Sequence, residues 1–190
     1  GATISLQSVN EQTLANIRRQ NISSESYREL QRRYTRDGIY TYTDIILGLP
    51  GETYTNYADG VSQVVADGQH NHIQFHNCSL LPNAEMGDPA YIERFGLRTV
   101  DQAICGIHSP VDEADEVEER LATVVATDAM PEPDWVRAKT FTWLVDLLYF
   151  DRLLQVPLVH LQSEHGLSLR RLVEAVAEAD AERYPTLAEL

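Results

Sequence analysis

Apolar runs alternate with amphipathic segments along the first half of the chain. The run at 39–47 is rich in β-branched and aromatic residues and lies between two glycines, which predicts a strand. Its last three residues are all apolar, as in a strand covered on both faces in a parallel sheet. Because helices are expected between successive strands, we predict an α/β fold with a parallel sheet. The other predicted strands are 3–8 and 72–78, and the predicted helices are about 10–19, 23–37, 54–67 and 88–96.

The second half of the chain predicts mainly helices. Residues 121–127 could form a strand or a helix, and their β-branched side chains favour a strand. The segment 134–154 is strongly apolar and aromatic, including Trp135 and Trp143, which predicts a core helix. A surface that contacts a partner or cobalamin is the alternative interpretation of that segment. Two further helices are predicted at 157–165 and 168–182.

Composition and charge limit the partners. The 190 residues are 43% hydrophobic, enough for a core, and carry a formal net charge of −14. So acidic a chain is not expected to bind nucleic acid or an anionic membrane. The run 112–119 is interpreted as a solvated linker or helix face. Because no apolar stretch is long enough to span a membrane and the two cysteines define no disulfide framework, we expect a cytoplasmic protein.

The turn after the strand at 39–47 fits either a ligand-binding turn or a purely structural one. Gly48 and Gly51 can adopt backbone angles closed to other residues, Pro50 fixes the angle between them, and Thr53 is a good N-cap. Ligands of α/β folds bind at the carboxyl ends of the strands, where this turn lies. A short glycine motif is a weak signal, so both interpretations stay open at this point.

Four segments, in their order and spacing, resemble one known family. They are Ser5-Leu-Gln-Ser8, the positions Leu14, Ile17, Arg19 and Asn21, the segment DIILGLPGET at 44–53, and the segment LLPNAEM at 80–86. The chain is similar to the C-terminal half of the radical SAM core, in the subgroup with an N-terminal cobalamin-binding domain. It departs from that family at Asp44, where glycine is common, and at Asn83-Ala84, where Gly-Thr is common.

The resemblance implies an architecture and a set of cofactors. It implies half of a (β/α) barrel at 1–98, an acidic linker with a candidate strand at 99–130, and a mainly α-helical extension at 131–190. The intact protein would use S-adenosylmethionine and a [4Fe–4S] cluster, with cobalamin as a further candidate, and would form a 5′-deoxyadenosyl radical. The family's Cys-x-x-x-Cys-x-x-Cys motif is absent from this sequence, so we expect the chain alone to bind no cluster and to be inactive.

The resemblance also assigns residues to the S-adenosylmethionine site. Gln7 and Ser8 fall beside the ribose and the methionine part. Arg19 falls on the methionine carboxylate, which a guanidinium binds through two parallel hydrogen bonds, and its neighbour Arg18 stays an alternative. The residues placed around the adenine are Gly48, Gly51, Glu52 and Leu81.

Three histidines and Cys105 are candidates for other chemistry. His70, His72 and His76 have the same parity, so on one strand they would share a face and could bind Zn²⁺ or Fe. Surface histidines are the favoured interpretation, because the pattern fixes no carboxylate partner, and no metal site is predicted. In a barrel that face would point at the substrate, which makes His76 and Asn77 candidate substrate contacts. A Cys105–His108 nucleophile is not favoured, because no oxyanion turn lies near it.

We therefore expect a fragment of a radical SAM enzyme that acts on a small molecule and works with the N-terminal half of the same protein. The opening Gly1-Ala2, which leads straight into a predicted strand, supports the fragment interpretation. No residue is assigned a catalytic role. The alternative is a non-catalytic half-barrel that binds a ligand or serves assembly. Exposed strand edges could also pair two copies into a homodimer.

Overall fold

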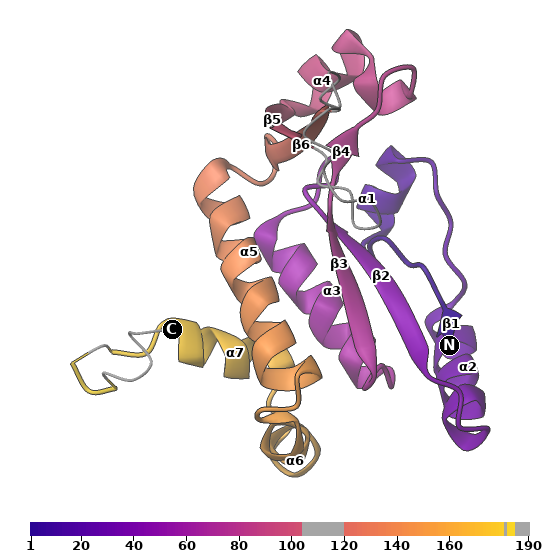
Figure 1. Cartoon of the computed structure of the whole chain (residues 1–190), viewed down its shortest axis with the longest axis vertical. Helices are drawn as coiled ribbons and strands as arrows, with labels where there is room; N and C mark the ends of the chain where they lie inside the picture. The colour runs from indigo at the N-terminus through magenta and orange to yellow at the C-terminus, as the bar shows by residue number, and fades with distance from the viewer. Residues whose placement is uncertain (104–119, 181, 185–190) are drawn as a thin grey trace, which may run out of the picture.

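The computed structural model describes residues 1–103, 120–180 and 182–184, and its architecture is α/β (Figure 1). Its first sheet is parallel, which confirms the predicted α/β class, while the half-barrel stays a prediction. The strand order in this sheet is β1 (Ala2–Thr3), β2 (Thr41–Leu47) and β3 (His72–Asn77). The helices between these strands are α1 (Glu11–Asn16), α2 (Ser24–Arg36) and α3 (Tyr54–Ala66).

The helices of the first half begin at the predicted capping residues. Asn10, Ser23 and Thr53 each accept a hydrogen bond from the backbone N–H three residues further on, at 2.9–3.1 Å. Asp88 caps α4 (Pro89–Phe95) through the N–H of Ala90, at 2.8 Å. These bonds satisfy N–H groups that have no partner inside the helix.

The first predicted strand is shorter than the sequence suggested. Only Ala2–Thr3 pair regularly with β2, and beyond them a single bridge joins Gln7 to Ile45. The N–H groups of Leu6 and Gln7 both donate to the carbonyl of Asp44, at 3.2 and 2.9 Å, so two residues of one chain oppose one of the other. Gln7 has a φ of +67°, unusual for a residue with a side chain. This bulge-like kink ends the pairing and redirects the chain at 7–8.

Among the residues that the structure describes, helices cover the parallel sheet on one face only. On that face Thr41 and Thr43 of β2 are fully buried under α2 and form hydrogen bonds with three buried side chains, those of Tyr27, Gln31 and Gln69. Further along the same face, Ile45, Leu47 and Ile73 join the main hydrophobic core with α3. The opposite face consists of Tyr42, Asp44 and Ile46 of β2 and His72, Gln74 and His76 of β3, which are half-buried or exposed, and we call it the open face.

A second, antiparallel sheet follows the first. Its order is β4 (Ser79–Leu80), β6 (Arg120–Ala126) and β5 (Arg98–Ala103). The strand predicted at 121–127 is confirmed, whereas β5 was not predicted. Cys78 joins the two sheets, because its N–H donates to the carbonyl of Leu47 and its carbonyl accepts from the N–H of Val124, both at 2.8 Å. The acidic run 112–119, Cys105 and His108 lie outside the described residues.

The C-terminal third is helical, as predicted. It consists of α5 (Glu132–Val145), a π-helical turn η2 (Asp146–Phe150), α6 (Gln155–His165) and α7 (Leu169–Ala177). Helices α3, α5 and α7 pack against one another through residues of the main core (Figure 1). Trp143 was predicted to be buried, but this is wrong: it is 48% exposed on the outer side of α5. Within the described ranges, no helix is long and apolar enough to cross a bilayer.

Candidate functional site

The carboxyl ends of β1 and β2 lie together, as the topology of a parallel sheet requires. The kink at Gln7 brings Ser8 to the start of the helix that follows the glycine turn. There the buried Ser8 hydroxyl donates a hydrogen bond to Oε1 of Glu52, and its oxygen accepts one from the N–H of Asn10 at 3.1 Å. The side-chain amide of Asn21 donates to the Ser8 carbonyl at 2.7 Å. Two residues that the resemblance assigned to one ligand, Ser8 and Glu52, are thus in direct contact.

Glu52 is a buried carboxyl group at this site. Its side chain is only 2% exposed, and its Oε2 has no hydrogen-bond partner within the described part of the chain. Burial raises the pKa of Glu52 to about 7, and the Ser8 hydroxyl opposes this rise by stabilising the charged form. Glu52 therefore keeps its proton to a higher pH than an exposed glutamate does. Because the side chain is buried, a ligand in this region would not touch Glu52 directly.

The glycine turn is built for a close approach to α1. Gly48 and Gly51 have φ values of +88° and +80°, which residues with a Cβ adopt only with strain. A Cβ at Gly51 would also collide with the side-chain amide of Asn16, which donates to the carbonyl of Pro50 at 2.9 Å. The conformation of the turn and its contact with α1 explain the glycine at 51 without a ligand.

The two candidate arginines point to different places. Arg19 Nη2 donates to the carbonyl of Ser5 at 2.6 Å and its Nε to Asn21 at 3.3 Å, so this guanidinium lies at the carboxyl end of β1. Arg18 is 77% exposed at its side chain and forms an ion pair with Glu85 at 2.7 Å. Arg19 has no carboxylate partner among the described residues. Of the two alternatives, Arg19 is the one that contacts Asn21, which also binds the Ser8 carbonyl.

The two candidate substrate residues lie on opposite faces of β3. His76 projects from the open face, with its side chain 54% exposed. Asn77 points to the covered side, where its Oδ1 accepts a hydrogen bond from Lys139 Nζ at 3.2 Å. The structure therefore does not bring them together.

The three histidines do not form a metal site in the described structure. His70 precedes β3, and its Nδ1 lies 2.8 Å from the hydroxyl of Tyr149. His72 packs edge-on against Phe150, with ring centroids 5.7 Å apart. Within residues 1–103 and 120–184, apart from 181, no group of three or more His, Cys, Asp or Glu side chains could hold a metal ion.

Sequence reasoning missed a polar group on the open face. The hydroxyl of Ser5 donates to Oδ2 of Asp44, and Nε2 of His76 lies 3.6 Å from Oδ1 of the same carboxylate. The available signal was Asp44 itself, a charged side chain within an otherwise uncharged strand.

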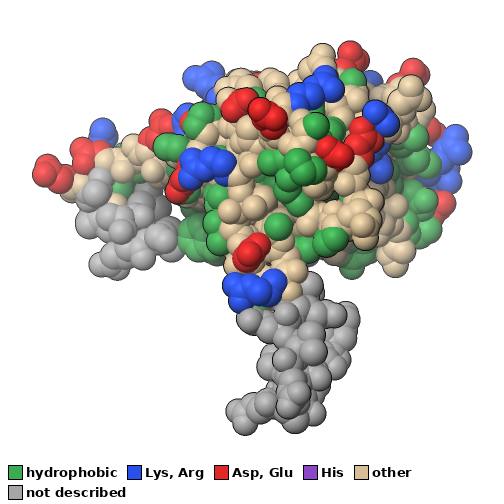
Figure 2. Space-filling model, turned by 90° about the horizontal axis from the view of Figure 1, so that it is seen from above, with side chains coloured by type: hydrophobic (Ala, Val, Ile, Leu, Met, Phe, Trp, Pro, Cys, Tyr) green, Lys and Arg blue, Asp and Glu red, His purple; other side chains and the backbone are tan. Residues whose placement is uncertain are grey.

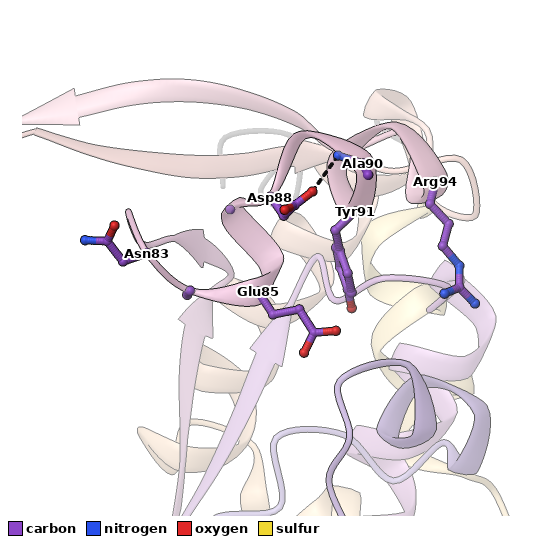
Figure 3. A pocket seen from close by; sticks show the side chains of 8 residues that line it. Asn83, Glu85, Asp88, Ala90, Tyr91 and Arg94 are labelled. Carbon is purple, nitrogen blue, oxygen red and sulfur yellow. Dashed lines mark hydrogen bonds between the residues drawn. The ribbon is translucent and has the colours of Figure 1, made fainter.

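One hollow of the surface lies away from these contacts, and a second includes one of the candidate residues. One of about 560 Å³ is formed by the segment from Asn83 to Arg94, where Glu85, Tyr91 and Arg94 surround it (Figure 3). A larger cleft of about 1050 Å³ lies between α1 and α2 and includes Arg19. Leu81 is 57% exposed, and its carbonyl lies against Gly87, which lines the first hollow. We base the candidate site on the carboxyl ends of β1 and β2 and on the open face, because the polar contacts converge there.

The end of the molecule that carries α4 has a mixed surface. Acidic and basic side chains lie among exposed hydrophobic ones in this view (Figure 2). Despite the overall charge of −14, this end is therefore not uniformly acidic.

Comparison with known proteins gives close relatives. No known family profile matches the chain. It is 35% identical, over 94% of its length, to the cobalamin-dependent radical SAM methyltransferase TokK of Streptomyces tokunonensis. It is 33% identical, over 98% of its length, to the 2-(S-pantetheinyl)-carbapenam-3-carboxylate methyltransferase of Streptantibioticus cattleyicolor. The chain spans about a quarter of the length of these two relatives, 26% and 27%.

Proposed function

This chain is homologous to a segment of the cobalamin-dependent radical SAM methyltransferases, and from that premise we propose that it forms part of the S-adenosylmethionine and substrate sites of such an enzyme. In this proposal residues 1–98 are the C-terminal half of the (β/α) barrel, with 99–130 as a linker and 131–190 as a helical extension. The covered face of the parallel sheet would be the outside of that barrel. The open face would be its interior, facing a small-molecule substrate and the N-terminal half of the same protein.

The assignment of the S-adenosylmethionine site rests mainly on Arg19. Its guanidinium is fixed at the carboxyl end of β1 by Ser5 and Asn21, and Nη1 forms no hydrogen bond within the described part of the chain. A planar guanidinium held in this way suits a carboxylate such as that of methionine. Gln7 and Ser8 would lie beside the ligand, and Gly48, Gly51 and Leu81 near its adenine. When bound, S-adenosylmethionine would supply the 5′-deoxyadenosyl radical on reductive cleavage.

The described residues do not fit the other implied cofactors. Cys78 is buried, and burial raises the pKa of its thiol to about 12, so it does not offer a thiolate to an iron–sulfur cluster. We assign no residue to cobalamin. The cluster ligands would therefore come from another part of a longer protein, and this chain alone would be inactive. The non-catalytic half-barrel and the edge-paired homodimer stay alternative hypotheses.

The test uses the full-length protein that carries this sequence, prepared anaerobically and reconstituted with iron and sulfide. Formation of 5′-deoxyadenosine is measured after addition of S-adenosylmethionine and dithionite. Arg19→Ala is expected to lower S-adenosylmethionine affinity about 10- to 100-fold, the range for one charge-assisted contact. Arg18→Ala is the matched control, since Arg18 pairs with Glu85, and should change affinity less than about 2-fold.

Two outcomes would overturn the proposal. Equal losses in the two arginine variants would refute the site assignment. A protein that takes up no iron and forms no 5′-deoxyadenosine would instead support the non-catalytic module.

A further inference from the structure

Ser5, Asp44 and His76 form a connected polar group on the open face of the parallel sheet. They come from three neighbouring segments: the chain after β1, the middle of β2, and the end of β3. In the register of the sheet, Asp44 is opposite Gln74 and Ile46 is opposite His76, so Asp44 and His76 are diagonal neighbours. Diagonal pairs on one face of a sheet are within reach of each other when a side chain is long.

The carboxylate of Asp44 receives a hydrogen bond at one oxygen and none at the other in the described chain. Its side chain is 16% exposed, and Oδ2 accepts the hydrogen bond from the Ser5 hydroxyl. Oδ1 is buried and has no hydrogen-bond partner in the described chain. A buried carboxylate oxygen without a donor is costly, so a donor is expected close by.

His76 Nε2 is a donor that lies close to this oxygen. Its distance from Oδ1 is 3.6 Å, slightly beyond a hydrogen bond. Hydrogen bonds of functional groups are often long before the ligand is bound and tighten in the complex. Because the ring is more than half exposed, a small rotation can close this gap.

We propose that Asp44, anchored by Ser5, is a positioning residue that holds the Nε2 proton of His76, so that His76 presents Nδ1 as a hydrogen-bond acceptor on the open face. A carboxylate that binds one nitrogen of an imidazole fixes both the ring orientation and the nitrogen that carries the proton. An outward acceptor of this kind suits an N–H or O–H group of a ligand. The inference rests on the proposed function only in taking His76 as a substrate contact. The contact between Asp44 and His76 can be tested independently of that function.

The experiment is NMR of this chain, with ¹⁵N-labelled histidine, near pH 8, where most imidazoles are neutral. Long-range ¹H–¹⁵N spectra show which nitrogen of His76 is protonated, and solvent exchange of that proton is measured. Two variants of similar side-chain size are compared. Asp44→Leu removes the acceptor, and Asp44→Asn keeps an acceptor oxygen. His72, on the same face, is the internal reference, and Gln74→Ala is the control substitution.

The expected result is an Nε2–H in the unmodified chain that exchanges about 10-fold faster in Asp44→Leu, the order expected for the loss of one hydrogen bond. Asp44→Asn should restore most of the protection, and His72 should be unchanged in every variant. A purely packing role for Asp44 would instead leave exchange unaltered in Asp44→Leu. That result, or a His76 proton found on Nδ1, would overturn the inference. Neither result depends on S-adenosylmethionine binding, so failure here is distinguishable from failure of the Arg19 test.

Discussion

Replacing Glu52 with glutamine should remove a pH-dependent loss of stability. Burial raises the pKa of Glu52 from 4.5 to about 7. Between these two values the folded chain keeps a proton that the unfolded chain has lost. The free energy of unfolding contributed by this group is therefore highest below about pH 4.5, falls as the pH rises, and levels off above about pH 7.

The size of the effect follows from the same two pKa values. At about 1.4 kcal/mol for each pH unit, their difference corresponds to a loss of about 3 kcal/mol by pH 8. Glutamine has the shape of protonated glutamate and keeps an oxygen for the Ser8 hydroxyl. Between about pH 5 and about pH 8, Glu52→Gln should therefore lose about 2–3 kcal/mol less of its free energy of unfolding than the unmodified chain, because only the contribution of Glu52 is removed. At about pH 8 it should be more stable than the unmodified chain.

Urea unfolding of both chains at several pH values measures this difference directly. Glu93→Gln is the control, because it also removes one carboxylate but from an exposed position on α4. It should leave the pH profile of stability unchanged. If the free energies of unfolding of the unmodified chain and of Glu52→Gln changed with pH in the same way, the reasoning would be refuted. That result would mean that Glu52 has the same pKa in the folded and the unfolded chain.

Two further predictions use matched pairs of substitutions. Gly51→Ala should destabilise the chain by about 1 kcal/mol more than Gly38→Ala in urea unfolding, because both positions have positive φ but only an alanine at 51 would displace the Asn16 amide from its hydrogen bond to the Pro50 carbonyl; equal losses would contradict the close approach. Leu47→Ala, at a side chain 1% exposed, should cost about 2–5 kcal/mol by thermal or urea unfolding. Leu81→Ala, at 57% exposure, should cost less than about 0.5 kcal/mol, and a large loss there would show that Leu81 is buried in solution.

Local signals were sufficient for much of the fold. The caps at Asn10, Ser23, Thr53 and Asp88 were predictable because a side chain and a backbone N–H only two or three residues apart decide them. The parallel sheet was predictable because helices separate its strands.

Features that depend on distant contacts were not predictable. The first strand ends early because two N–H groups compete for one carbonyl, that of Asp44, 37 or 38 positions further along the chain. Gln31 is buried because it completes a network with Thr41. Trp143 is exposed although its helix is strongly apolar, because α3 and α7 cover only one side of α5.

The candidate site was predictable in part. Resemblance indicated the neighbourhood of Ser8 and Arg19, but only the structure shows that Arg19 and Arg18 have different partners, since adjacent side chains after a helix end can point in unrelated directions. The alternation of a strand implies that His76 and Asn77 face opposite ways, yet which of the two faces is open depends on the helices around the sheet. The assigned ligand contacts themselves stay predictions.

The junction at Cys78 has a consequence for how this part of the protein can change during evolution. The link between the two sheets consists of main-chain atoms, through the carbonyl of Leu47 and the N–H of Val124. Main-chain hydrogen bonds exclude proline at positions 78 and 124, where an N–H is required, but they are formed by any other residue. The side chains around the junction can therefore be replaced one at a time, within the limits of packing, while the two sheets keep their connection at the end of β2.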